Sequence, residues 1–182
     1  MQKAAGVIIL ILLTIASSIS YALRVEKVRT FSDWDVVIAN RKESCLNNLY
    51  FAYAVSAPKR SVSFKDGIAT HGVAYAVVSY VMRGAWTFSI RTNLSQSREM
   101  RFALTAGGRA YTLSDARGML ALTTSSSQDV SIINNLIDHS DYFEVHARFN
   151  DEHVAVDTYS LDGLINALQY IEQNFANISC AN

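Results

Sequence analysis

The chain has 182 residues and a formal net charge of zero, from 16 basic and 16 acidic side chains. Affinity for nucleic acid comes mainly from neutralising phosphates, so a chain with this charge balance is not expected to bind nucleic acid. The length suits one domain with a hydrophobic core of its own. With two cysteines, the chain has too few thiolates for a cysteine-based zinc site.

Residues 1–22 are predicted to be a targeting segment. Lys3 supplies a short positive start, residues 4–16 form an apolar run, and Ser20-Tyr21-Ala22 fits the small-x-small cleavage rule, with the cut before Leu23. The alternative is an uncleaved membrane anchor, but the apolar run is shorter than the roughly 20 residues that span a bilayer. The sequence therefore predicts a periplasmic or secreted protein, attached to a membrane only if this segment is retained.

Residues 23–182 are expected to form a single β-rich domain. Residues 24–29 are polar and expected to be loose, and residues 56–65, which contain Pro58, are expected to form a loop or an edge. Short strands separated by turn signals are predicted at residues 34–39, 49–55, 73–82, 85–92, 101–104, 109–113 and 119–123. Together with a later hairpin and two helices, this pattern is typical of an antiparallel β-sandwich or barrel-like core, with the helices covering an open end or face.

The first helix is predicted to start at Ser126. Ser126 and Asp129 have the spacing of a helix start, where each side chain can satisfy an unpaired backbone N–H. Apolar residues then recur at three- and four-residue spacing, which predicts one buried helix face made of Val130, Ile133, Leu136 and Ile137.

A β-hairpin is predicted directly after this helix. Residues 142–149 alternate strictly between polar and apolar side chains, which is typical of a half-buried strand. Asn150-Asp151 suits a two-residue turn, because both residue types tolerate the left-handed conformation. On the return strand, Val154 and Val156 are expected to face the core.

The outer face of this hairpin carries the residues that invite a chemical interpretation. The predicted pairing places Arg148 opposite His153 and His146 opposite Ala155. Two histidines on one face suggest a metal site, but the arginine between them and the lack of a third ligand favour a solvated face. Glu144 and Asp157 are expected to face each other there, and an acid/base pair for sugar chemistry would need a cleft around them.

The second helix is predicted to open at Ser160, with Asp162 in its first turn complementing the helix dipole. Its apolar stripe is expected to comprise Leu161, Leu164, Ile165, Leu168 and Ile171.

Motifs for catalysis are not evident. No serine lies in a G-x-S-x-G motif, and Gly107-Gly108 is far short of a loop that cradles phosphates. We therefore expect no catalytic residues, no cofactor and no bound metal. Aromatic residues of the early strands are expected to fill the core, with a ligand pocket as the alternative; they are Tyr50, Phe51, Tyr53, Tyr75 and Tyr80.

Two stretches resemble the invasion-associated locus B family of alpha-proteobacteria. The sequence from Phe31 through Asp33 and Trp34 to Val36 is similar to the family's F-g-D-W-x-V opening. Near the other end, residues 133–149 resemble its helix-then-strand segment. The segment that contains Ser160, Leu161 and Gly163 is similar to the family's S-L-x-G-F ending. The resemblance implies a small exported β-rich protein, tied in some members to entry into host cells, with no catalytic residues.

The two cysteines are expected to form one intramolecular disulfide. Export would place Cys45 and Cys180 in an oxidising compartment, and no other cysteine competes for either. A free thiol, an intermolecular bridge and no pairing at all are the alternatives. The family's own cysteine pattern does not transfer, because Ile38 stands where the family usually has a cysteine.

Taken together, the sequence predicts an exported, non-enzymatic protein that binds a protein partner in the envelope or on a host surface. Two alternatives stay open, namely a periplasmic carrier of a small ligand and an envelope enzyme whose site leaves no motif.

Overall fold

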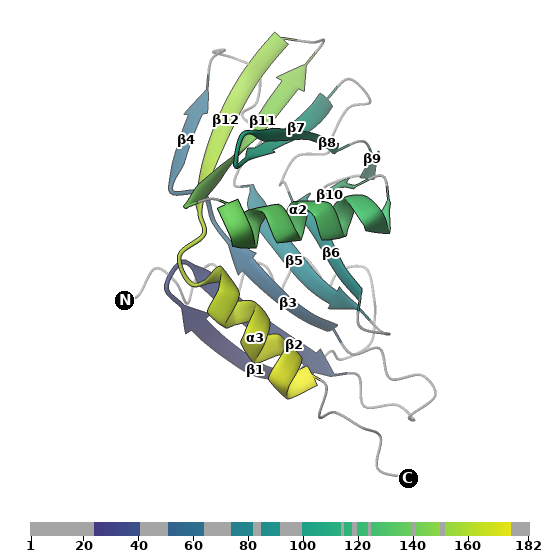
Figure 1. Ribbon diagram of the computed structural model, residues 1–182, viewed down its shortest axis with the longest axis vertical. Helices are drawn as coiled ribbons and strands as arrows, with labels where there is room; N and C mark the ends of the chain where they lie inside the picture. Colours follow the sequence, from purple (N-terminus) through teal and green to yellow (C-terminus); the bar gives the residue numbers. More distant parts are fainter. Residues whose placement is uncertain are drawn as a thin grey trace.

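The computed structural model describes residues 24–40, 51–63, 74–81, 85–91, 100–113, 115–117, 120–123, 125–139, 141–149 and 152–175. Two antiparallel sheets and two helices make up this part of the chain (Figure 1). The fold class predicted from the sequence, mainly β with two helices in the later half, is confirmed. No helix within the described residues is long and apolar enough to cross a membrane.

The larger sheet has seven strands in the order β1-β2-β3-β5-β6-β10-β9. The strands are β1 (Arg24–Phe31), β2 (Trp34–Asn40), β3 (Phe51–Ser56), β5 (Tyr75–Val81), β6 (Ala85–Arg91), β9 (Asp115–Arg117) and β10 (Leu120–Leu122). Residues 24–29 were expected to be loose, and that expectation is wrong. They pair with residues 36–40 of β2, so backbone hydrogen bonds hold a segment whose side-chain pattern carries little strand signal.

The smaller sheet has five strands in the order β4-β12-β11-β7-β8. The strands are β4 (Arg60–Ser63), β7 (Met100–Ala106), β8 (Arg109–Leu113), β11 (Tyr142–Phe149) and β12 (Glu152–Ser160). The short strand β4 forms one edge, as expected for the segment around Pro58. The hairpin of β11 and β12 is also confirmed, with Arg148 opposite His153 as predicted.

The hydrophobic core lies between the two sheets and beneath the helices. Phe88 of β6 contacts Phe143 of β11 edge to face, with ring centroids 6.0 Å apart, and thereby joins the sheets. Phe143 in turn stacks on Tyr159 of β12 at 4.8 Å. These three rings are at most 1% exposed, so a column of aromatic side chains fixes the distance between the sheets.

Helix α2 (Ser126–His139) packs against β6 and β7, with Ile132, Ile133 and Leu136 buried. The predicted stripe is therefore rotated, and Val130 and Ile137 are exposed. The predicted cap is also wrong: Ser125 caps the helix through the backbone N–H of Gln128. Asp129 is instead buried and accepts hydrogen bonds from the Phe88 N–H and the Thr123 hydroxyl, both at 2.8 Å. A tertiary contact has replaced the local capping role.

Helix α3 (Leu164–Phe175) packs against β1, β2 and β3. Its predicted start at Ser160 is wrong, because Ser160 ends β12 and its hydroxyl accepts the Asp162 N–H at 3.1 Å. A turn through Gly163 precedes the helix. Leu164, Leu168 and Ile171 are buried as predicted, whereas Ile165 is exposed.

A β-bulge in the hairpin changes which side of β12 faces the core. The pairing shifts between Ala147–Ala155 and Arg148–His153, so Val154 is an extra residue on β12. His146 consequently lies opposite Val156 and not Ala155.

The expected core position of Val156 on β12 is wrong for the same reason. Ala155, Asp157 and Tyr159 are buried, while Val156 is only partly buried. Asp157 pairs with Val145, so it lies on the face opposite to Glu144 and the proposed carboxylate pair does not form.

Candidate functional site

Residues of the two family motifs, far apart in the sequence, meet at one junction. The turn between β1 and β2 lies against the segment that links β12 to α3 (Figure 1). The Trp34 indole N–H donates to the Ser160 carbonyl at 3.1 Å, and the Asp33 N–H donates to the Asp162 carbonyl at 3.2 Å. We call this contact the motif junction. Three of the seven motif residues singled out in the sequence take part in these bonds, namely Asp33, Trp34 and Ser160. Of the others, Phe31 and Gly163 approach each other closely, and Val36 and Leu161 are buried.

Gly163 is required at the motif junction. Its φ is +90°, and a Cβ atom placed there would lie 2.0 Å from the Phe31 carbonyl oxygen. Beside it, the Ser32 hydroxyl donates to the Asp162 carboxylate. Trp34 and Val36 are fully buried. The motif residues are thus explained by close packing, and none of them lines a pocket that the structure describes.

One ion pair borders the junction. Lys59 contacts the Asp33 carboxylate. Burial opposes the charge of Asp33, but hydrogen bonds from Lys59 and Ser160 and the positive charge of Lys59 outweigh it, so the pKa of Asp33 lies below its ordinary value. Asp33 is therefore ionised and structurally engaged at neutral pH.

The sequence raised two other kinds of site, a disulfide that it predicts and a histidine metal site that it disfavours. Cys45 and Cys180 both lie outside these residues, so the disulfide stays a prediction. Within the described ranges, no group of three or more His, Cys, Asp or Glu side chains could hold a metal ion.

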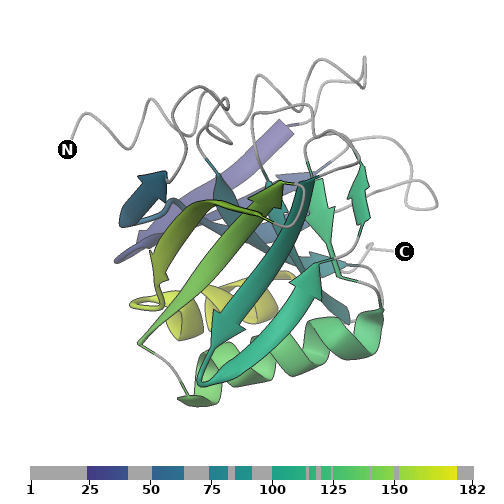
Figure 2. The same ribbon diagram turned by 90° about the horizontal axis from the view of Figure 1, so that it is seen from above.

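The outer face of the five-stranded sheet is a different kind of surface. Helices α2 and α3 lie on the opposite side of this sheet (Figure 2), and the outward side chains are half-buried or exposed. From the strand register, this face carries Arg60 and Val62 of β4, Val156 and Thr158 of β12, Tyr142, Glu144, His146 and Arg148 of β11, Arg101, Ala103 and Thr105 of β7, and Ala110 and Thr112 of β8. We refer to these residues as the outer face.

A polar cluster lies at the centre of the outer face. The Thr105 hydroxyl oxygen is 3.1 Å from His146 Nε2, and Glu144 Oε2 is 3.4 Å from the same nitrogen. In a nucleophilic triad the hydroxyl and the carboxylate engage different ring nitrogens, so that the base can take a proton while the acid orients it. Here both groups share one nitrogen. The cluster can hold and orient polar groups, but it is not arranged as a proton relay.

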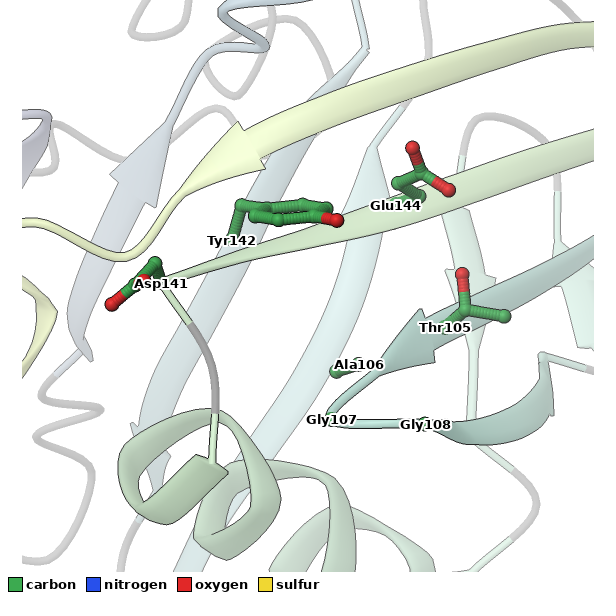
Figure 3. A pocket seen from close by; sticks show the side chains of 7 residues that line it. All are labelled: Thr105, Ala106, Gly107, Gly108, Asp141, Tyr142 and Glu144. Carbon is green, nitrogen blue, oxygen red and sulfur yellow. The ribbon is translucent and has the colours of Figure 1, made fainter.

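A shallow pocket opens beside this cluster, with a volume of about 350 Å³. It lies where the turn between β7 and β8 meets the start of β11, and it is lined by Thr105, Ala106, Gly107, Gly108, Asp141, Tyr142 and Glu144 (Figure 3). Gly107 and Gly108 both have positive φ, at 53° and 76°, so the turn needs its glycines. The pocket wall at Ala106 is held by buried Asn135 of α2, whose side-chain amide donates to the Ala106 carbonyl at 2.7 Å.

The sequence pointed to parts of this pocket without assembling it. Alternation predicted Tyr142, Glu144 and His146 on one outward face, and this is confirmed. The pairing of β11 with β7, which brings Thr105 beside Glu144, joins segments about 40 residues apart and leaves no local signal.

The early aromatic residues behave as core side chains where the structure describes them. Tyr75 is buried, and burial raises its pKa. Tyr53 is partly buried, and its pKa is raised for the same reason. Tyr80 packs edge-on against Trp86 at 4.7 Å. None of the three lines the pocket.

Comparison with known proteins gives a likeness in structure. No family model and no curated protein matches the chain. Among solved structures, the crystal structure of invasion associated protein B from Bartonella henselae matches with a TM-score of 0.51 and 9% sequence identity. The match covers 84% of this chain and 100% of that one. The resemblance read from the motif residues is thus confirmed at the level of structure, and the chain has the fold of invasion associated protein B.

Proposed function

We propose that the chain is an exported, non-enzymatic binding protein that contacts a protein partner through the outer face. The observation that carries this proposal is the contrast between the two sides of the five-stranded sheet. One side is filled by the aromatic column and the core, while the other presents polar side chains and the pocket. A face of this kind, uncovered by either helix, is suited to contact another molecule.

The proposed export is inferred from the sequence, and the proposed class of partner is inferred from the likeness to invasion associated protein B. The targeting segment at residues 1–22 supports a periplasmic or secreted location, with cleavage before Leu23. The name of the similar structure associates that protein with invasion. We infer a protein partner in the envelope or on a host surface for this chain as well.

The geometry of the polar cluster supports a non-enzymatic role. A hydroxyl and a carboxylate at one histidine nitrogen compete for the same position, so Thr105 is not activated as a nucleophile by His146. Hydrogen-bonding groups that are held in place but not linked in a relay are useful for recognition.

Site-directed cross-linking in intact cells tests the proposal. A photo-reactive residue is introduced at Thr158 or Thr112 on the outer face, with Glu172 on α3 as the exposed control position. We expect each of the two face positions to give a discrete adduct. An excess of the chain without the photo-reactive residue should suppress this adduct, and Glu172 should give none. Adducts that form equally from Glu172 would contradict a role for the outer face.

The export half of the proposal has a separate test. Cell fractionation followed by N-terminal sequencing should find the protein outside the cytoplasm, beginning at Leu23. A cytoplasmic protein that retains residues 1–22 would contradict export.

A further inference from the structure

The pocket at the end of the outer face has a lining with an unusual balance of hydrogen-bonding groups. Its charged side chains are the carboxylates of Asp141 and Glu144, and no lysine or arginine is among the lining residues. Ionised carboxylates only accept hydrogen bonds. The lining therefore complements a group that is rich in donors and carries positive charge.

Tyr142 adds an aromatic surface to this lining. It is 58% exposed, the highest value among the exposed large hydrophobic residues of the described chain. In Figure 3 its ring extends along β11 with the hydroxyl end directed toward Glu144, while Asp141 lies beyond the opposite end of the ring. A planar cation over this ring would gain a cation–π contact and lie within reach of a carboxylate.

The floor of the pocket leaves room for such a group. Gly107 and Gly108 carry no side chain, and a Cβ atom at Gly108 would meet no atom within 4 Å. The hydrogen bond from Asn135 to the Ala106 carbonyl holds this floor against α2. Space, an aromatic surface and acceptor groups therefore occur together.

From this combination we propose that the pocket seats an arginine side chain of the protein partner. The guanidinium stacks on the Tyr142 ring and donates two parallel hydrogen bonds to the Glu144 carboxylate. Arginine fits better than lysine because its planar group can do both at once, whereas an ammonium is a compact, strongly hydrated charge. This inference rests on the proposed function, since it names the chemistry by which the outer face recognises its partner.

The test uses a blocked arginine, N-acetyl-arginine amide, as the probe. The exported chain is labelled with ¹⁵N, and backbone amide shifts are followed while the probe is added. The uncharged isostere N-acetyl-citrulline amide is the matched ligand control, and Glu172→Gln on α3 is the matched variant control for Glu144→Gln. A second variant, Tyr142→Leu, keeps an apolar side chain and removes the ring.

The expected result is a saturable shift confined to the lining residues, including Gly107 and Gly108, with the arginine probe and not with the citrulline probe. Glu144→Gln and Tyr142→Leu should each weaken the dissociation constant about tenfold, and Glu172→Gln should leave it unchanged. Equal binding of the two probes, shifts spread over the surface, or no saturable shift would overturn the inference.

The two proposals can fail separately. If the arginine probe does not bind but Thr158 still cross-links a partner, the pocket inference fails and the proposed function stands. If the probe binds at the pocket but neither face position captures a partner, the proposed function fails, and with it the assignment of the arginine to a partner protein.

Discussion

The motif junction and the outer face differ in almost every physical respect. The junction joins the β1–β2 turn to the β12–α3 segment through buried groups such as Trp34 and a glycine that admits no side chain. The outer face consists of half-buried and exposed side chains, most of them polar, on the five-stranded sheet. The residues that carried the family resemblance lie at the junction. The residues that could contact a partner lie elsewhere.

This difference separates the residues that preserve the fold from the face that we propose for binding. A junction in which two backbone segments approach each other closely tolerates few residue types, so it leaves a short recognisable pattern in the sequence. An exposed sheet face tolerates many types of side chain, so its only signal in the sequence is the alternation of polar and apolar residues. The following changes should therefore damage stability at the junction and in the core while leaving the outer face intact.

The largest effect is expected for Leu164→Asp on α3. Leu164 is 1% exposed, and a carboxylate there would be buried without a partner. We expect a loss of about 4 kcal/mol in the free energy of unfolding, measured by chemical denaturation. The adjacent Ile165→Asp is the control, because Ile165 is 47% exposed and should cost less than about 1 kcal/mol. Equal effects would mean that α3 does not pack as described.

Gly163→Ala should have the next largest effect. The new Cβ would collide with the Phe31 carbonyl in a left-handed backbone conformation, so a cost of about 3 kcal/mol is expected. Gly108→Ala shares the positive φ but meets no neighbour, so only the backbone strain of about 1–2 kcal/mol applies. Thermal unfolding measures the stability of both variants, and the difference between them gives the cost of the clash. A Gly163→Ala protein no less stable than Gly108→Ala would refute the clash.

Asp129→Ala should cost about 2 kcal/mol, because the buried Phe88 N–H would lose its acceptor. Asp138→Ala on the exposed side of the same helix should change stability by less than about 0.5 kcal/mol. Denaturant titration of the two variants makes the comparison. Matching values for both would remove the tertiary role that we assign to Asp129.

The smallest effect is a pH dependence at the motif junction. The pKa of Asp33 is lower in the folded protein than in the unfolded chain, so its ion pair stabilises the fold above the ordinary aspartate pKa of 3.8. This contribution disappears as the pH falls from there through the lowered folded value. Because Lys59 is 57% exposed, it should amount to about 1 kcal/mol or less.

Lys59→Met should reduce this loss of stability between pH 7 and pH 3. The measurement is the free energy of unfolding of both proteins across that range. A variant with the same acid dependence as the parent chain would show that Asp33 is not stabilised by Lys59.

Sequence reasoning predicted the architecture well where patterns are long. The eight-residue alternation of β11 identified its strand and both of its faces. The return strand β12 was harder, because both of its faces carry apolar residues. One extra residue at Val154 then decided which face is buried. A bulge depends on pairing with a neighbour, so the segment itself gives no sign of it.

Helix boundaries failed at two residues that take part in contacts far away in the sequence. Ser160 and Asp129 both looked like local capping groups. In the fold, the Ser160 carbonyl accepts the Trp34 indole, and Asp129 accepts the Phe88 N–H. The pocket was unpredictable for the same reason, since its two walls are brought together by the pairing of β7 with β11 and by the hydrogen bond from Asn135 to Ala106.

The central claim is that the outer face binds a partner while the motif junction maintains the fold. It is tested most directly by measuring partner cross-linking from Thr158 and unfolding free energy in the same two variants, Glu144→Gln and Gly163→Ala. We predict that Glu144→Gln loses the adduct with a stability change below about 0.5 kcal/mol. Gly163→Ala should lose stability and keep the adduct at temperatures where it remains folded. Retention of the adduct by Glu144→Gln, together with its loss in folded Gly163→Ala, would assign binding to the junction and contradict the account.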